Sequence, residues 1–147
     1  MKSSCLVFML AAGGMATATA TAALAAGDPI AIAVDAEPTP AETAALKQAL
    51  GPEDYGDMQP LTVGHADLNG DRRPDLLARS DGMGGCGSAG CQTWAVLATP
   101  SGYAPTAITL AVAAGKVFVL PTIHEGMHDL RFESGSSIFE WNGREYP

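Results

Sequence analysis

The sequence has 147 residues, of which 16 are Asp or Glu and 8 are Lys or Arg, so its formal net charge is −8 at pH 7. Repulsion between an acidic chain and a polyanion disfavours nucleic acid and anionic membrane surfaces as partners. The length is enough for one small domain.

The first 25 residues have the three parts of a secretory signal. Lys2 gives a positive start, Leu6 to Ala12 form a short apolar run, and Ala23-Leu24-Ala25 is a small-x-small cleavage site. Removal of residues 1–25 leaves seven basic and sixteen acidic residues, a net charge of −9. Because no later segment offers about 20 apolar residues, we predict a periplasmic or secreted protein without a transmembrane anchor.

The mature chain is predicted to have a lead-in and one domain. Residues 26–38 mix Ala, Ile and Val with Pro and acidic residues, and are either a short strand at Ile30–Val34 or a mobile segment. Residues 39–147 are expected to form a single β-rich domain.

Signals for a helix start stand together just after the lead-in. Thr39 is a good N-cap, Pro40 suits the first helical position, and Glu42 completes a capping box with Thr39. Ala41 to Leu50 are good helix formers, and Gly51-Pro52 ends the pattern. One short amphipathic helix is therefore predicted.

After this helix, turn residues and alternating apolar residues replace the helical pattern. A loop is expected over residues 51–60, and a period of two indicates strands at 61–65, 76–79, 93–98, 107–113, 116–120 and 128–133. Since no βαβ alternation indicates a parallel sheet, the predicted fold class is α+β and β-dominated. It has one short N-terminal helix and about seven antiparallel strands in a meander.

The C-terminal segment is predicted to be a β-hairpin. Asn142-Gly143 is a favoured type I′ turn, and aromatic residues lie on both sides of it. In that register Trp141 faces Arg144, and Phe139 faces Tyr146.

The mature chain keeps two cysteines, Cys86 and Cys91. An even pair in an exported protein indicates a disulfide, which in so small a ring contributes about 2 kcal/mol. A redox or zinc pair is the alternative, but the spacing is not Cys-x-x-Cys and no further cysteine completes a zinc site. The Gly-rich segment 81–92 around the pair is expected to be an exposed contact loop.

Oxygen-bearing side chains recur at alternate positions between two strand-like segments. Gathered carboxylates repel one another, so a loop that collects them needs a cation, and hard oxygen ligands suit Ca²⁺. The alternative is a solvated acidic turn. The flanks are not helical and Ala78 stands where an EF-hand closes with Glu, which excludes that family. The predicted calcium ligands are Asp67, Asn69, Asp71, the backbone carbonyl of Arg73, and Asp75.

A second metal motif is His124-Glu125-Gly126-Met127-His128, which spells His-Glu-x-x-His. On a helix, His124 and His128 would hold Zn²⁺ while Glu125 acts on a bound water. Pro121 upstream and Gly126 at the centre oppose a helix, so the other interpretation is a loop from Pro121 to Met127 that leads into a strand at His128. Because no other catalytic set stands out, we predict that the protein is not an enzyme.

The segment from Gly64 to Leu77 resembles the calcium-loop repeat of FG-GAP/VCBS-type secreted proteins, in which a strand is followed by Asp-x-Asn-Gly-Asp-Gly-x-Pro-Asp-Leu and a second strand. Arg72 stands where that family usually has Gly, and a positive φ there costs Arg about 1 kcal/mol. The wider layout is similar to that of small periplasmic β proteins, some of which are lysozyme-inhibitor-like immunity proteins of Gram-negative bacteria.

The features together lead us to expect an exported, non-enzymatic binding module that is stabilised by one Ca²⁺. Its expected partner is a protein, and the resemblance implies an inhibitor or immunity protein against a cell-wall hydrolase. Two alternatives stand beside this. One is a zinc-dependent hydrolase at residues 124–128, and the other is a purely structural envelope protein whose acidic loop is only solvated.

Overall fold

The computed structural model of the chain describes residues 27–147, so the predicted signal at residues 1–25 lies outside the described part. Within that part, two helices and many short antiparallel strands confirm the predicted β-dominated α+β class. None of the described helices has the length and apolar character needed to cross a membrane.

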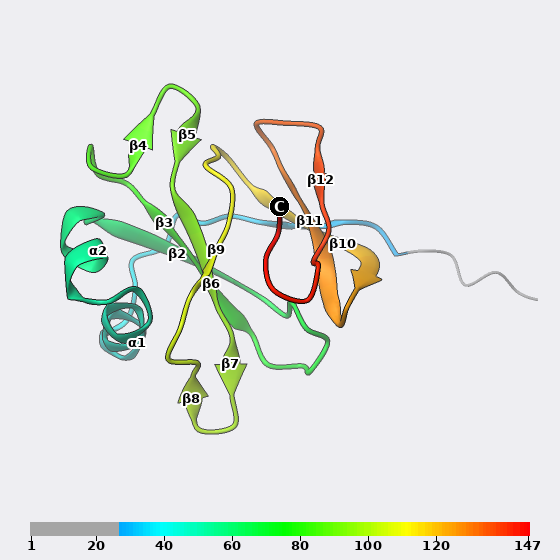
Figure 1. Cartoon of the computed structure of the whole chain (residues 1–147), viewed down its shortest axis with the longest axis horizontal. Helices are drawn as coiled ribbons and strands as arrows, with labels where there is room; N and C mark the ends of the chain where they lie inside the picture. Colours follow the sequence, from blue (N-terminus) through cyan, green and yellow to red (C-terminus); the bar gives the residue numbers. More distant parts are fainter. Residues whose placement is uncertain (1–26) are drawn as a thin grey trace, which may run out of the picture.

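Two four-stranded antiparallel sheets form the body of the molecule (Figure 1). The central sheet has the strand order β2 (Leu61–Ala66), β3 (Asp75–Ser80), β6 (Thr93–Val96), β9 (Ile108–Thr109). The outer sheet has the order β1 (Ile30–Ile32), β10 (Val117–His124), β11 (Met127–Phe132), β12 (Ile138–Phe139). Apart from β1, sheet neighbours follow one another along the chain, as in a meander.

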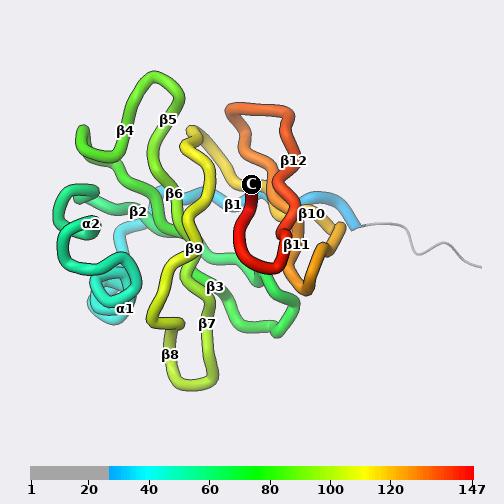
Figure 2. Tube along the Cα trace, in the orientation of Figure 1, coloured from blue at the N-terminus to red at the C-terminus, as the bar shows by residue number. Residues whose placement is uncertain are grey.

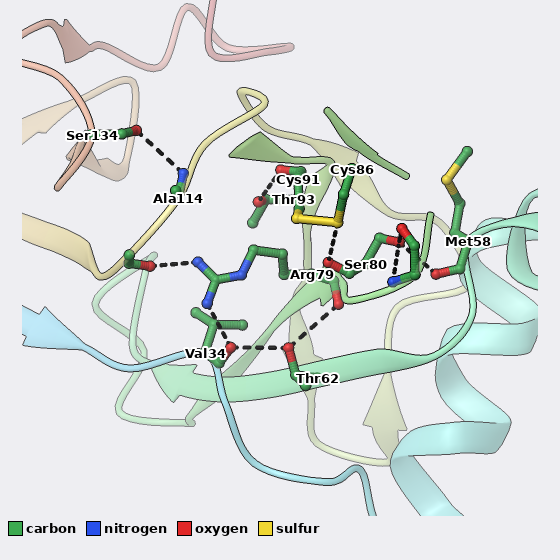
Figure 3. The surroundings of a disulfide bond; sticks show 12 residues. Val34, Met58, Thr62, Arg79, Ser80, Cys86, Cys91, Thr93, Ala114 and Ser134 are labelled. Atoms are coloured by element: carbon green, nitrogen blue, oxygen red, sulfur yellow. Dashed lines mark hydrogen bonds between the residues drawn. A yellow bond between two sulfur atoms is a disulfide. The ribbon is translucent and has the colours of Figure 1, made fainter. Parts of the chain in front are cut away.

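Two small hairpins extend from opposite ends of the central sheet, as the chain trace in Figure 2 shows. One is formed by β4 (Cys86–Gly87) and β5 (Gly90–Cys91), and the other by β7 (Ala98–Thr99) and β8 (Gly102–Tyr103). The predicted disulfide is confirmed, because Cys86 is bonded to Cys91 across the first hairpin (Figure 3).

Both faces of the central sheet are covered. Leu77 of β3 belongs to the apolar core shared with the outer sheet, whereas its neighbours Leu76 and Ala78 belong to the core under the helices. Adjacent strand residues point to opposite faces, so this alternation means that the central sheet is the middle of three layers. On the helical side, Leu46 and Tyr55 complete the second core.

The helical layer contains one expected and one unexpected helix. Helix α1 (Pro40–Leu50) begins with the predicted capping box, in which Glu42 and the N-cap Thr39 exchange hydrogen bonds. Helix α2 (Pro52–Asp57) lies where a loop was predicted over residues 51–60, and that prediction was wrong. Gly51, with φ of 81°, turns the chain, Pro52 starts a new helix, and burial of Tyr55 holds that helix on the core.

The lead-in is part of the folded domain. Strand β1 pairs with β10 of the outer sheet, and Ala36 then forms a bridge with Val63 of the central sheet. Val34 between them is buried in the core. The crossing brings the Ala33 carbonyl so close to Gly64 that a Cβ at that glycine would overlap with it. The segment from β1 to Ala36 therefore connects the two sheets.

The C-terminal segment differs from the predicted hairpin. Only Ile138–Phe139 is a strand, and it pairs with β11. A type I′ turn needs positive φ at both central residues, and of Asn142 and Gly143 only the glycine has it. The predicted facing pairs are also wrong, since Trp141 packs against Tyr146 with ring centroids 5.1 Å apart, and the Asn142 amide donates to the Glu145 carbonyl. Burial of Tyr146, whose hydroxyl donates to the His128 carbonyl, directs this end of the chain.

Candidate functional site

The predicted calcium loop connects β2 to β3, two neighbouring strands of the central sheet. Its first residue organises it, because the Asp67 carboxylate accepts hydrogen bonds from three following backbone amides. These are the amides of Gly70 at 2.7 Å, Asp71 at 3.1 Å and Arg72 at 2.8 Å. The loop is therefore folded around the Asp67 side chain.

The side chains of Asn69 and Asp71 lie next to the Asp67 carboxylate. The Asn69 amide oxygen and an Asp67 carboxylate oxygen both accept the Asp71 backbone N–H at 3.1 Å, so these two oxygens are neighbours. The Asn69 amide nitrogen donates to Asp71 at 3.3 Å. The structure thus brings together three of the predicted side-chain ligands.

Arg73 neutralises part of the negative charge of this group. Its backbone amide donates to Asp71 at 2.8 Å and its guanidinium to the same carboxylate at 2.9 Å. The amide hydrogen bond, opposed by slight desolvation and joined by the guanidinium and by Asn69, holds the pKa of Asp71 below its ordinary value. A cation already lies at this carboxylate.

Asp75 has a different position from the other acids of the loop. It is fully buried, and its two oxygens accept backbone amides from Leu68 and Ala98, each at 2.7 Å. Burial raises the pKa of this carboxyl, against the effect of the two hydrogen bonds. Asp75 therefore ties the loop to β7.

The loop also joins the two sheets. Leu68 is fully buried in the core shared by the sheets, and its carbonyl accepts the His128 amide of β11 at 2.7 Å. A change in loop conformation would consequently disturb the contact between the layers.

The His-Glu-x-x-His segment is a hairpin rather than a helix. His124 ends β10, Glu125 and Gly126 form the turn with φ of 46° and 85°, and Met127 begins β11. The register pairs Ile123 with His128, so His124 and His128 lie on opposite faces of the hairpin. The geometry that a helical zinc motif needs is absent, and the predicted loop over Pro121–Met127 is mostly strand.

Sequence reasoning missed a polar cluster on one face of this hairpin. His124 Nδ1 lies 2.7 Å from an Asp129 oxygen, and its Nε2 lies 4.0 Å from Glu140. Asp129 is buried, whereas the other two side chains are exposed. In residues 27–147, these three form the one group of His, Cys, Asp or Glu whose ligand atoms all lie within 4.8 Å of one another. Spacing in the sequence did not select Glu140, because this residue follows β12 and reaches the hairpin only through the pairing of β12 with β11.

The predicted contact loop is both exposed and firmly held. Met83, in the turn that precedes β4, is 97% exposed. Behind it, the Asp81 amide donates to the Pro60 carbonyl at 2.8 Å, and the Ser80 hydroxyl donates to the Met58 carbonyl at 2.7 Å. Figure 3 shows Ser80 and Met58 on the side of the disulfide that faces the helices. An exposed apolar side chain on a braced loop is well suited to protein contact.

Comparisons of the chain with protein-family models, curated proteins and solved structures give no match.

Proposed function

We propose that the protein is an exported, non-enzymatic binding module whose fold is stabilised by one Ca²⁺, and that it inhibits a cell-wall hydrolase. The observation that carries the calcium proposal is the convergence of Asp67, Asn69 and Asp71 on a loop that connects both sheets. Hard oxygen donors at this density are the ligands that Ca²⁺ prefers.

The loop residues fit the ion in a defined way. Asp67, Asn69 and Asp71 would supply side-chain oxygens and Arg73 its backbone carbonyl, with Asp75 acting directly or through water. The Arg73 guanidinium forms an ion pair with Asp71. Bound Ca²⁺ would take its place beside this carboxylate, so binding would release the Arg73 side chain. Because Leu68 of the same loop lies in the core, stabilisation of the loop would extend to both sheets.

Calcium binding is tested by thermal unfolding of the purified protein in excess Ca²⁺ and in EDTA. A ligand at a hundredfold excess over its Kd stabilises by about 2.7 kcal/mol, which raises the midpoint by several degrees. Asp71→Asn should remove this response. Asp54→Asn, which changes an acid of α2 outside the loop, should keep it. A midpoint that is equal in Ca²⁺ and EDTA would remove calcium from the proposal.

The partner proposal uses the contact loop and the charge of the chain. A net charge of −9 after removal of residues 1–25 favours a basic protein, and Met83 offers an apolar anchor on a braced loop. Lysis of bacterial cell walls by added lysozyme, measured with and without the protein, is the test. Inhibition that Met83→Glu weakens and that Met83→Leu retains supports the proposal. An unchanged lysis rate would favour a purely structural envelope protein.

A further inference from the structure

The cluster on the β10–β11 hairpin comes from β10, β11 and the residue that follows β12. The pairings Leu130 with Phe139 and Arg131 with Ile138 place Glu140, which follows β12, in register with Asp129. Continuing the hairpin register from Ile123 and His128 brings Thr122 opposite Asp129. His124 lies two residues along β10 from Thr122 and therefore on the same face.

Hydrogen bonds fix the imidazole of His124 in one orientation. Its Nδ1–H donates to one Asp129 oxygen at 2.7 Å, and the Thr122 hydroxyl donates to the other. In the neutral imidazole, Nε2 is then the nitrogen with a free lone pair, and it faces the Glu140 carboxylate at 4.0 Å. A carboxylate that holds one imidazole nitrogen while the other faces a second donor is the usual arrangement around a metal-bound histidine.

The separation of these donors is slightly wider than a small ion needs. Bonds from Zn²⁺ to imidazole nitrogen and to carboxylate oxygen are each about 2.0–2.2 Å, so two donors at the tetrahedral angle lie about 3.4 Å apart. The distance from Nε2 to the Glu140 oxygen is 4.0 Å. Glu140 is exposed and free to move closer, and water would fill the remaining coordination positions.

The negative charge of the cluster also favours a bound cation. Two carboxylates, Asp129 and Glu140, face one histidine, so the cluster stays negative even when the imidazole is protonated. Glu125 in the adjacent turn adds to this negative field at His124. The imidazole donor selects against Ca²⁺ and Mg²⁺, which take oxygen ligands, and favours a divalent transition metal.

We propose that His124 and Glu140 bind one divalent transition-metal ion, Zn²⁺ being the probe, and that Asp129 acts as the positioning residue for the imidazole. The site is independent of the calcium loop and differs from the helical zinc motif, since His128 lies on the other face of the hairpin. A bound ion would cross-link β10 to the segment after β12 and so fasten the edge of the outer sheet.

Zinc binding is measured by calorimetry on the full protein after EDTA treatment and dialysis, in excess Ca²⁺ so that the acidic loop cannot take up zinc. One Zn²⁺ per chain is expected. His124→Ala should abolish it, Glu140→Gln should weaken it at least tenfold, and Asp129→Asn should weaken it roughly 10–100-fold. The matched controls His65→Ala and Glu145→Gln should bind as the parent does.

NMR of ¹⁵N-labelled imidazoles gives a readout that does not depend on affinity. On addition of Zn²⁺, the His124 Nε2 resonance should shift while Nδ1 stays protonated, and Asp129→Asn should alter this pattern. The proposal is overturned if the parent takes up no zinc, or if His124→Ala binds zinc as tightly as the parent. It would also be overturned if zinc shifted only His65 or His128. These outcomes leave the calcium test untouched.

Discussion

Arg72 has a φ of 67° in the middle of the acidic loop, within the left-handed region of backbone space. The calcium-loop repeat that this segment resembles usually has Gly at this position, where a positive φ is free of strain. A residue with a Cβ is strained there by about 1–2 kcal/mol, whereas Gly is not. The Arg72 side chain is exposed, and no ion pair or hydrogen bond of its guanidinium is found within residues 27–147.

Arg72→Gly should therefore raise the free energy of unfolding by about 1 kcal/mol, because it relieves the strain and loses no contact. Chemical denaturation with and without Ca²⁺ measures the gain. Arg72→Ala is the control, since it removes the same charge and keeps the Cβ, and it should leave stability nearly unchanged. Equal stabilisation by Ala and Gly would show that charge, not backbone strain, is responsible.

Glu42 connects the start of α1 to the central sheet. Its carboxylate accepts the Thr39 amide at 2.7 Å and pairs with His65 Nε2 at 2.6 Å, although the residue is only 7% exposed. Burial raises the pKa of Glu42, but the hydrogen bonds from Thr39 and His65 outweigh it and hold the pKa below the ordinary 4.5.

A carboxyl with a lowered pKa stabilises the fold above its unfolded value, and this contribution is lost as the pH falls through the folded value. Glu42→Gln should therefore cost about 1 kcal/mol at neutral pH, as expected for a weakened cap. The difference from the parent should shrink below pH 4.5. Unfolding midpoints from neutral to acidic pH, with Glu37→Gln as an exposed control, measure it. A difference that stayed constant across this range would contradict the role of the charge.

The β10–β11 hairpin shows that the local secondary structure determines whether His-Glu-x-x-His can act as a zinc motif. Two consecutive positive φ values, at Glu125 and Gly126, match a tight two-residue turn, and Gly126 takes the second of them. The motif His-Glu-x-x-His carries its helical meaning only when about two turns of helix surround it. Here strands surround it, and His124 joins a different set of partners.

Gly126→Ala distinguishes the two structures directly. In the hairpin it should destabilise the protein by about 1 kcal/mol, because Ala is strained at a φ of 85°. In a helix the same change would stabilise by a similar amount. Gly135→Ala is the matched control, since that glycine is exposed, a Cβ there would meet nothing, and its φ is not positive. Thermal unfolding of the two variants gives the sign.

At the scale of the whole molecule, the predicted calcium loop between β2 and β3 connects the central sheet to the outer sheet. Leu68 is fully buried in the core shared by both sheets, although the residues on either side of it are polar and partly exposed. The layers consequently depend on one loop residue as well as on their strands.

Leu68→Ala should cost about 2–5 kcal/mol, the usual range for a fully buried leucine. The loss should be seen in both layers at once, as a single unfolding transition at lower denaturant concentration by fluorescence of Trp94 and of Trp141. Met83→Ala, at a fully exposed site, should leave the transition unchanged. A separate early transition for Trp141 would mean that the outer sheet unfolds on its own.

The elements that depend on residues close together in the sequence could be predicted from the sequence. Helix α1 was predictable from Thr39, Pro40 and Glu42, and the disulfide from an isolated cysteine pair. Helix α2 was missed because its six residues include three acids and a glycine, and burial of Tyr55 holds it on the core. The C-terminal hairpin was predicted from Asn142-Gly143, but contact of Trp141 with Tyr146 overrides that turn preference.

The candidate sites divide in the same way. Asp67, Asn69 and Asp71 are close in sequence, so their convergence followed from spacing alone. Glu140 meets His124 only because β12 pairs with β11, and no periodicity in a single segment reports such a pairing. The contact of Glu140 with His124 can be found only when the register of β10, β11 and β12 is known.

The crossing of the first strand between the sheets has a consequence for how the chain folds. Ile30 pairs with Val119, so the outer sheet cannot close until residues far along the chain have been made. The pairings β2–β3, β3–β6 and β6–β9 need only residues 61–109 and join segments that follow one another closely. Contacts of short sequence separation form faster, which places the addition of β1 to the outer sheet late, because β10–β11 and β11–β12 are as local as the pairings of the central sheet. Until β1 joins β10, Val34, which follows it in the chain, has not yet taken its buried place between the two sheets.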